Sequence, residues 1–271
     1  MDAIIVFLVI GLIAGIVGSL IGLGGGVIIV PALLYLSPYV LERGLTTAEA
    51  VGTSLVVLIF TALSSSLTFI RQKRVDYRSG LLFFVASGPG AIFGATLTGR
   101  FPPGPFYIAF GLFMLLTSML IVFRERFKPI GKKWKYERTY TDPSGQVHHF
   151  GYSLLPALLL GAAVGIVSGM FGIGGGSLFV PMLIALFRYP PHVATATSMF
   201  VILLSSVPGA AVKIALGEVY GLGIAGLAPG ALLGGWLGAK IAGKLSSPAL
   251  MRVLLFAFLL LALRMIWQGL S

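Results

Sequence analysis

An apolar segment with three consecutive glycines occurs twice in this chain. The first copy reads GLIAGIVGSLIGLGGGVIIVP from Gly11 to Pro31, and the second reads GAAVGIVSGMFGIGGGSLFVP from Gly161 to Pro181. A run of glycines weakens a helix, because each glycine costs about 1 kcal/mol relative to alanine. The duplication therefore predicts two related halves, each containing a helix that is broken at its glycines.

The apolar segments are long enough to cross a lipid bilayer. Hydrophobic residues make up 57% of the chain and charged residues only 10%, whereas about a quarter of the residues in a soluble domain are charged. Roughly twenty apolar residues span the hydrocarbon core as a helix. We therefore expect an all-α polytopic transmembrane bundle in the cell membrane, without any sheet. Its helices should fall in apolar runs at 3–37, 46–70, 79–99, 105–123, 153–187, 193–216, 221–241 and 249–268.

Two further motifs divide the chain into similar halves joined by a polar linker. In each half an A-x-x-T-S motif is followed by P-G-A-x-x-G. We expect transmembrane repeats at 1–123 and 153–271 and a linker at 124–152. The linker carries seven Lys and Arg residues, which favour a cytoplasmic location because basic loops remain on that side of the membrane.

Two arrangements of the pseudosymmetric repeats are open. If each of the eight runs crosses once, the repeats are parallel and thirteen of the nineteen Lys and Arg residues lie inside. If the chain turns back at each triple glycine, the repeats are inverted and fifteen lie inside. The inverted arrangement is common in secondary transporters, and we favour it.

The glycine breaks also predict a binding site for a small anion. Broken helical backbone is tolerated in a membrane only where protein buries it or it faces a wet cavity. N-H groups freed at the start of the next half-helix attract negative charge. Helix packing is the alternative role of such glycines. The glycines predicted to contact the substrate are Gly24, Gly25, Gly26, Gly174, Gly175 and Gly176.

Hydroxyl residues and prolines recur beside the breaks. Hydroxyls can donate to anion oxygens, although in a membrane helix they also bond to their own backbone. The hydroxyl residues predicted to bind the substrate are Thr53, Ser54, Thr197 and Ser198. Prolines remove a backbone donor and kink helices. Positions expected to support the site or to act in gating are Pro31, Pro89, Pro181, Pro229, Ser65 and Ser205.

The charged residues favour an anionic substrate. The net charge is +11, and all eight acidic residues fall in termini, loops or helix ends. Ion relays usually use buried carboxylates or histidines, so the coupling ion stays open, as do the transport direction and the oligomeric state. We expect Lys213 to extend to the membrane interface. With no cysteine and with His148 and His149 lacking an acidic cluster, we expect no metal site, no cofactor and no nucleic-acid partner.

The ordered motifs resemble the TauE/SafE family of sulfite and organosulfonate exporters, also called the 4-toluene sulfonate uptake permease family. The resemblance rests on G-x-G-G-G-x(4)-P, A-x-x-T-S and P-G-A-x-x-G, each present twice, and covers nearly the whole chain apart from the linker. The second half departs from the first in having Ala196 in place of Gly52. The resemblance implies transport of small sulfur-containing or related organic anions. We expect a secondary transporter that works by alternating access; an anion channel and an intramembrane enzyme are the alternatives.

Overall fold

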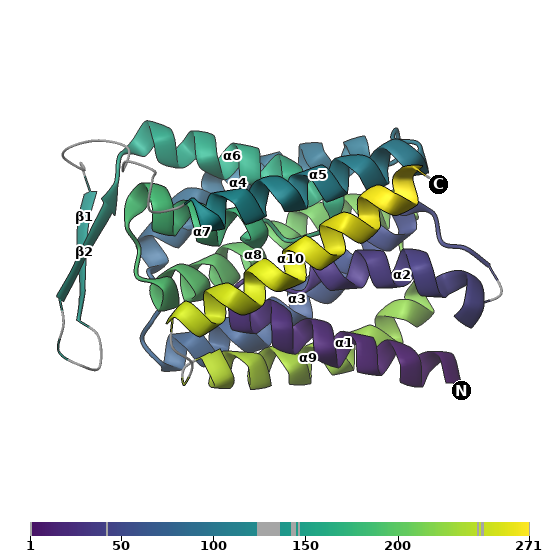
Figure 1. The fold of residues 1–271 in the computed structure, drawn as a ribbon, viewed down its shortest axis with the longest axis horizontal. Coiled ribbons are helices and arrows are strands. Elements are labelled where there is room, and N and C mark those ends of the chain that lie inside the picture. Colours follow the sequence, from purple (N-terminus) through teal and green to yellow (C-terminus); the bar gives the residue numbers. More distant parts are fainter. Residues whose placement is uncertain are drawn as a thin grey trace.

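The computed structural model is a bundle of helices with one β-hairpin at one end (Figure 1). It describes residues 2–41, 43–123, 136–141, 145, 147–242, 244 and 247–270. The helices of the first half are α1 (Asp2–Ile21), α2 (Gly26–Val40), α3 (Thr47–Arg71), α4 (Tyr77–Thr98) and α5 (Pro103–Val122). Those of the second half are α6 (Leu154–Phe171), α7 (Gly176–Phe187), α8 (Pro191–Ala215), α9 (Gly221–Ala242) and α10 (Ser247–Leu270).

The first and fifth apolar runs each break into two helices, as predicted. In the first half, α1 ends at Ile21 and α2 begins at Gly26; in the second half, α6 ends at Phe171 and α7 begins at Gly176. Each of the other runs forms a single helix close to its predicted bounds. The triple glycines are therefore true interruptions of the helical backbone.

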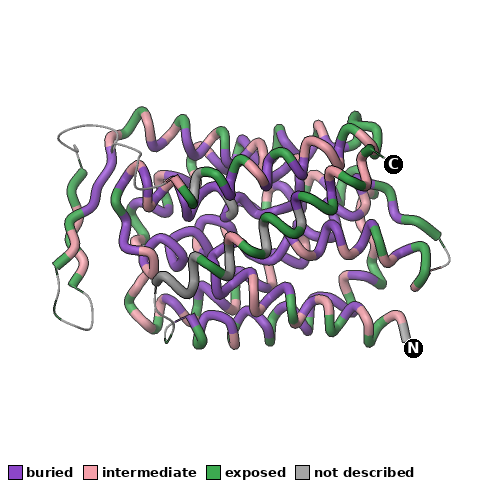
Figure 2. Tube along the Cα trace, in the orientation of Figure 1, coloured by how far each residue is buried: buried purple, intermediate pink, exposed green. Residues whose placement is uncertain are grey.

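Six helices in the described part of the chain are long and apolar enough to cross a membrane. They are α1, α3, α4, α6, α8 and α9. The apolar stretches within α2, α5 and α7 are shorter. Many large apolar side chains are exposed on the outer helices, as the exposed positions in Figure 2 show. Lipid would cover these side chains, whereas water would leave large apolar patches that soluble monomers rarely carry.

The linker contains a sheet that the sequence analysis did not expect. Strand β1 (Tyr136–Thr141) pairs antiparallel with β2 (Val147–Tyr152). The strands contain three tyrosines and two threonines, which suit a pleated surface. They lie in a polar segment, so a search for apolar runs could not predict them. Phe150 anchors the hairpin by packing on Tyr189 with ring centroids 4.4 Å apart. Residues 124–135, 142–144 and 146 of the predicted linker lie outside the described residues.

Helices from the two halves pack together in matching pairs. Helix α1 lies against α9, and α6 lies against α4 in the same way; α5 packs on α10, and the central helices α3 and α8 contact each other. Both termini lie at the end of the bundle opposite the hairpin (Figure 1). Because α1 begins at that end whereas α6 begins at the hairpin, these two helices run in opposite directions.

Candidate functional site

The two glycine breaks lie against each other. A side chain at Gly26 would overlap the carbonyl oxygen of Gly172, and one at Gly176 would overlap the carbonyl oxygen of Gly22. A Cβ atom at either position would separate the breaks. The last glycine of each triplet is therefore required for this close approach between the two halves.

The other break glycines are required by their backbone conformation. Each break contains three glycines with positive φ, a region that disfavours other residues by about 1–2 kcal/mol. The φ values are 84° at Gly22, 79° at Gly24, 98° at Gly25, 68° at Gly172, 74° at Gly174 and 71° at Gly175. The repeated G-x-G-G-G spacing thus encodes the same turn in both halves.

The start of each short helix presents backbone donors. The Gly25 carbonyl accepts the first bonds of α2, and the Gly175 carbonyl accepts the first bonds of α7. Among the described residues, the N-H groups of Gly25, Gly26, Gly175 and Gly176 have no backbone acceptor. Helix N-termini carry partial positive charge, so both breaks supply donors suited to an anion.

One serine ties each break to the opposite half. Ser54 Oγ in α3 donates to the Gly172 carbonyl oxygen at 2.7 Å, and Ser198 Oγ in α8 donates to the Gly22 carbonyl oxygen at 2.8 Å. These bonds bring both predicted serines to the breaks. Their hydroxyl protons are engaged with protein carbonyls here, so direct contact with a substrate stays a prediction.

The neighbouring threonines join the helix ends instead. Thr53 Oγ1 accepts the backbone N-H of Tyr220 at 2.9 Å, just before α9, and Thr197 Oγ1 accepts that of Asp76 at 3.1 Å, just before α4. The start of α3 therefore lies near the end of α8, and the start of α8 lies near the end of α3. These central helices are antiparallel.

Two buried apolar residues that the sequence analysis missed fill the space beside the breaks. A Cβ at Gly24 would lie 2.6 Å from Leu58 Cδ2, and one at Gly174 would lie 2.9 Å from Ile202 Cγ2. Leu58 and Ile202 are fully buried. Each lies one helical turn after the serine of an A-x-x-T-S motif, but that spacing does not show that they pack on the breaks. They close the space beside both breaks in this structure.

The predicted supporting residues have structural contacts away from the breaks. Ser65 Oγ donates to Ser19 Oγ in α1 at 2.7 Å and lies near the Gly235 carbonyl of α9. Ser205 Oγ bonds only weakly to its own helix, at 3.5 Å from the Ile202 oxygen. Helices α2, α4, α7 and α9 contain the predicted prolines, which are Pro31, Pro89, Pro181 and Pro229.

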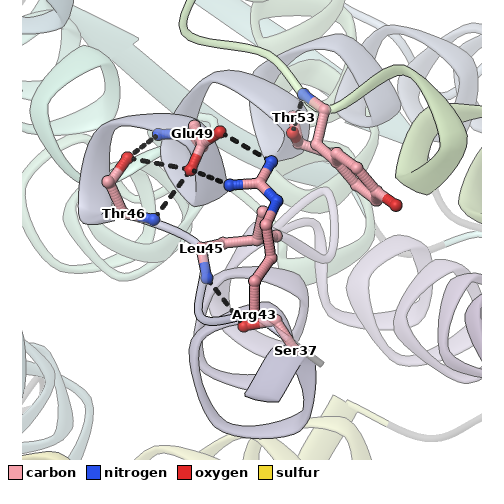
Figure 3. Close-up of polar contacts among 7 residues, drawn as sticks. Ser37, Arg43, Leu45, Thr46, Glu49 and Thr53 are labelled. Carbon is pink, nitrogen blue, oxygen red and sulfur yellow. Dashed lines mark hydrogen bonds and ion pairs between the residues drawn. The ribbon is translucent and has the colours of Figure 1, made fainter. Parts of the chain in front are cut away.

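A polar cluster lies at the start of α3 (Figure 3). Thr46 and Glu49 form a capping box at the start of α3, and the Arg43 guanidinium pairs with the Glu49 carboxylate at 3.0 Å. Arg43 also lies over the Tyr220 ring, 5.5 Å from its centroid. The contact between Arg43 and Tyr220 links the α2–α3 loop to the residue before α9, whose N-H donates to Thr53.

The prediction that Lys213 reaches the membrane interface is wrong. Its side chain is 0% exposed and its Nζ lies 2.6 Å from Glu218 Oε2. The loop carrying Glu218 packs against Gly52, where a Cβ would overlap the Glu218 carbonyl oxygen. This contact explains why the first half has glycine where the second half has Ala196: the loop needs the space.

Comparison with known proteins shows which family the chain belongs to. The model of the sulfite exporter TauE/SafE family matches residues 7–265. The chain belongs to the TauE/SafE family. It is 43% identical over 267 residues to "Probable membrane transporter protein YunE" of Bacillus subtilis, covering 98% of each chain. It is 28% identical to "Probable membrane transporter protein MJ0441" of Methanocaldococcus jannaschii, covering 93% of this chain and 91% of that protein. No solved structure matches it.

Family membership agrees with the architecture. The six long apolar helices make this TauE/SafE protein a multi-pass membrane protein. The names of its relatives describe membrane transporters and not enzymes. In the described part of the chain, no group of His, Asp and Glu residues could hold a metal ion. We therefore describe the contact between the two breaks as a candidate transport site.

Proposed function

We propose that this TauE/SafE protein is a secondary transporter of small sulfur oxyanions, either sulfite or organosulfonates. The observation that carries the proposal is the contact between the two glycine breaks. It brings the N-termini of α2 and α7, which come from different halves of the chain, to one place. The family description names sulfite export, and sulfite offers the negatively charged oxygens that such donors bind.

The binding determinants are backbone groups supported by side chains. The N-H groups of Gly25, Gly26, Gly175 and Gly176 supply the donors, and each helix terminus adds a partial charge of about +0.5. The hydroxyls of Ser54 and Ser198 orient the breaks and, on a rearrangement of their bonds, reach the substrate, whereas Thr53 and Thr197 hold the helix ends. Backbone donors suit a transporter because glycines let an anion approach the main chain closely.

The transport cycle follows from an inverted repeat. The exchanged bonds of Thr53 with Tyr220 and of Thr197 with Asp76, together with the opposite directions of α1 and α6, support inversion. Rocking of one repeat against the other would open the site alternately to each side. Leu58 and Ile202 close the centre in this structure, so an anion can reach the breaks only after these side chains separate.

Transport by purified protein in liposomes tests the proposal. Liposomes loaded with unlabelled sulfite should take up external radiolabelled sulfite at a saturable rate, because a carrier exchanges its substrate across the membrane. Protein-free liposomes are the control. Passage of current without counterflow would identify a channel instead.

A thermal-shift screen tests the substrate class. Sulfite, thiosulfate, sulfoacetate and sulfolactate should raise the melting temperature of the purified protein, because a ligand that binds the folded state stabilises it. Simple carboxylates provide the comparison. Stabilisation by carboxylates alone would contradict selectivity for sulfur oxyanions.

A further inference from the structure

A second concave site lies between the hairpin and the loop that joins α3 to α4. Its cavity measures about 220 Å³ and is lined by residues 73–76, by residues 138–140 of β1, and by Phe150 and Val193. Phe150 is buried against Tyr189 and holds the hairpin over the start of α8. The cavity is thus built from both halves of the chain and from the linker between them.

The lining carries an excess of positive charge. Lys73, Arg74 and Arg138 contribute three cations, and Asp76 is the one acidic residue among the described residues of the lining. The Asp76 carboxylate already accepts bonds from the N-H and hydroxyl of Ser79 and, at 3.2 Å, from the hydroxyl of Tyr189. Burial raises the pKa of Tyr189, which therefore remains a neutral donor. Three donors thus bond to the Asp76 carboxylate, which carries one negative charge beside the cations of the lining.

Arg138 supplies an unused donor. Its Nε atom is buried and has no hydrogen-bond partner among the described residues. A buried N-H without an acceptor is unfavourable, and a bound oxyanion would satisfy it. A guanidinium also matches the geometry of two oxygens of a sulfate, sulfonate or phosphate group.

The loop opposite Arg138 is held in an unusual conformation. Lys73 has a φ of 55°, which is uncommon for a residue other than glycine. Its N-H donates to the Ile70 carbonyl at 2.9 Å, and that of Arg74 donates to the Phe69 carbonyl at 3.2 Å. These bonds fix the chain as it leaves α3 and hold Lys73 and Arg74 at the cavity.

The cavity lies close to the candidate transport site. Val193 in its lining precedes Ser198 by five residues of α8, or about 7.5 Å along the helix axis. Asp76, also in the lining, donates its N-H to Thr197. We propose that this cavity binds a small oxyanion of sulfur or phosphorus at the hairpin end of the bundle, held by Lys73 and Arg138. The proposal requires binding and not transport, so it can fail while the proposed transport stands.

Direct binding measurements test this site. The purified full-length protein in a neutral detergent is titrated with radiolabelled sulfate and phosphate. Arg138→Gln removes the unpaired Nε, and Lys73→Asn removes a cation while allowing a left-handed backbone, which asparagine adopts more readily than most residues. Each variant should bind at least one of the anions about tenfold more weakly, the effect of losing one charge-assisted bond. Arg78→Gln is the matched control, because Arg78 is exposed in α4 and lies outside the lining.

Nanodiscs distinguish a free anion from a lipid headgroup. If the ligand is an anion free in solution, the wild type binds radiolabelled phosphate equally well in nanodiscs of phosphatidylcholine and in nanodiscs of mixed phosphatidylcholine and phosphatidylglycerol. If the headgroup is the ligand, phosphatidylglycerol displaces phosphate from the wild type, and the Lys73→Asn variant retains less of this lipid. Either outcome supports the site and names its occupant.

Two results would overturn the proposal. One is the absence of sulfate, phosphate and phosphatidylglycerol binding to the wild type. The other is an anion affinity of Lys73→Asn equal to that of the wild type. Lys73 is exposed, so its substitution should leave the protein folded. Melting curves without anion establish that each variant is folded, and if Arg138→Gln unfolds, Lys73→Asn decides the test.

Discussion

At the residue scale, the break glycines have two roles, which can coincide at one position. Gly25 and Gly175 adopt positive φ, whereas Gly26 and Gly176 provide space for the opposite break. The first role is local and the second depends on the other half of the chain. A substitution at either kind of position is expected to be harmful, but for a different reason, and paired variants can separate the two.

Comparison of Gly25→Ala with Gly217→Ala separates strain from crowding. Gly217 has a φ of 70° and open space around it, whereas a Cβ at Gly25 would also lie 2.6 Å from the Ala14 carbonyl oxygen. Both variants should lose about 1–2 kcal/mol from strain, and Gly25→Ala should lose about 1–3 kcal/mol more from overpacking. Thermal melting in detergent measures the difference. Equal losses would show that the contact with Ala14 is easily relieved.

The serines at the breaks offer a second residue-scale prediction. Ser54→Ala should destabilise the protein by about 1–3 kcal/mol, because it leaves the buried Gly172 carbonyl without its donor. Ser198→Ala should do the same at Gly22. If these hydroxyls also contact the anion, substrate affinity should fall by roughly five-fold to a hundred-fold. Melting curves and equilibrium binding of sulfite measure the two effects separately.

Ser66→Ala is the matched control for Ser54→Ala, because both serines lie in α3. Ser66 in α3 is buried, and its hydroxyl has no partner among the described residues. Ser66→Ala should therefore leave stability unchanged or raise it slightly, since no bond is lost. Wild-type sulfite affinity in folded Ser54→Ala and Ser198→Ala proteins would restrict these serines to a structural role.

At the element scale, α3 and α8 hold the halves together through opposite ends. Each carries a threonine that accepts the N-H of the residue before a helix of the other half and a serine that bonds to the other break. The contacts made by α3 and α8 are not perfectly symmetric. The α8 end carries the Lys213–Glu218 pair, whose lysine is fully buried, and this pair packs on Gly52 of α3.

The ion pair should respond asymmetrically to removal of either charge. Glu218→Gln leaves the fully buried Lys213 cation unpaired and should cost about 3–5 kcal/mol, the usual loss on breaking a buried pair. Lys213→Met should cost less, because the Glu218 side chain is 27% exposed and water can solvate it. Arg43→Gln is the control, since its ion pair is more exposed and worth about 0–1 kcal/mol. Melting temperatures rank the stability of the three variants. A larger loss of stability in Lys213→Met than in Glu218→Gln would refute this account.

At the scale of the whole molecule, the bundle has two distinct ends. The hairpin and the α3–α4 loop, which carries Lys73 and Arg74, lie at one end, and the α2–α3 loop and both termini lie at the other (Figure 1). Basic segments remain on the cytoplasmic side of a membrane. The hairpin end is therefore expected to face the cytoplasm and the opposite end the exterior.

Single cysteines in this cysteine-free chain test the orientation. Val147→Cys places an exposed thiol in β2, and Gly44→Cys places one in the exposed α2–α3 loop. An impermeant maleimide should label the Gly44→Cys protein in intact cells and the Val147→Cys protein only after permeabilisation. The second variant serves as the control for the first. The opposite labelling pattern would reverse the orientation of the bundle.

The helices and their breaks could be read from the sequence because their causes are local. Apolar length determines which segments can cross a bilayer, and glycine spacing determines where positive φ is available, so the breaks at Gly24–Gly26 and Gly174–Gly176 were predictable. Only the tertiary structure shows that Ser54 and Ser198 donate to the opposite breaks, that Leu58 and Ile202 close the centre, and that Lys213 pairs with Glu218. Each of these features depends on packing between segments whose relative positions no local pattern encodes. The hairpin was missed for a related reason: its strands lie in the polar linker, and the packing of Phe150 on Tyr189 anchors them to the bundle.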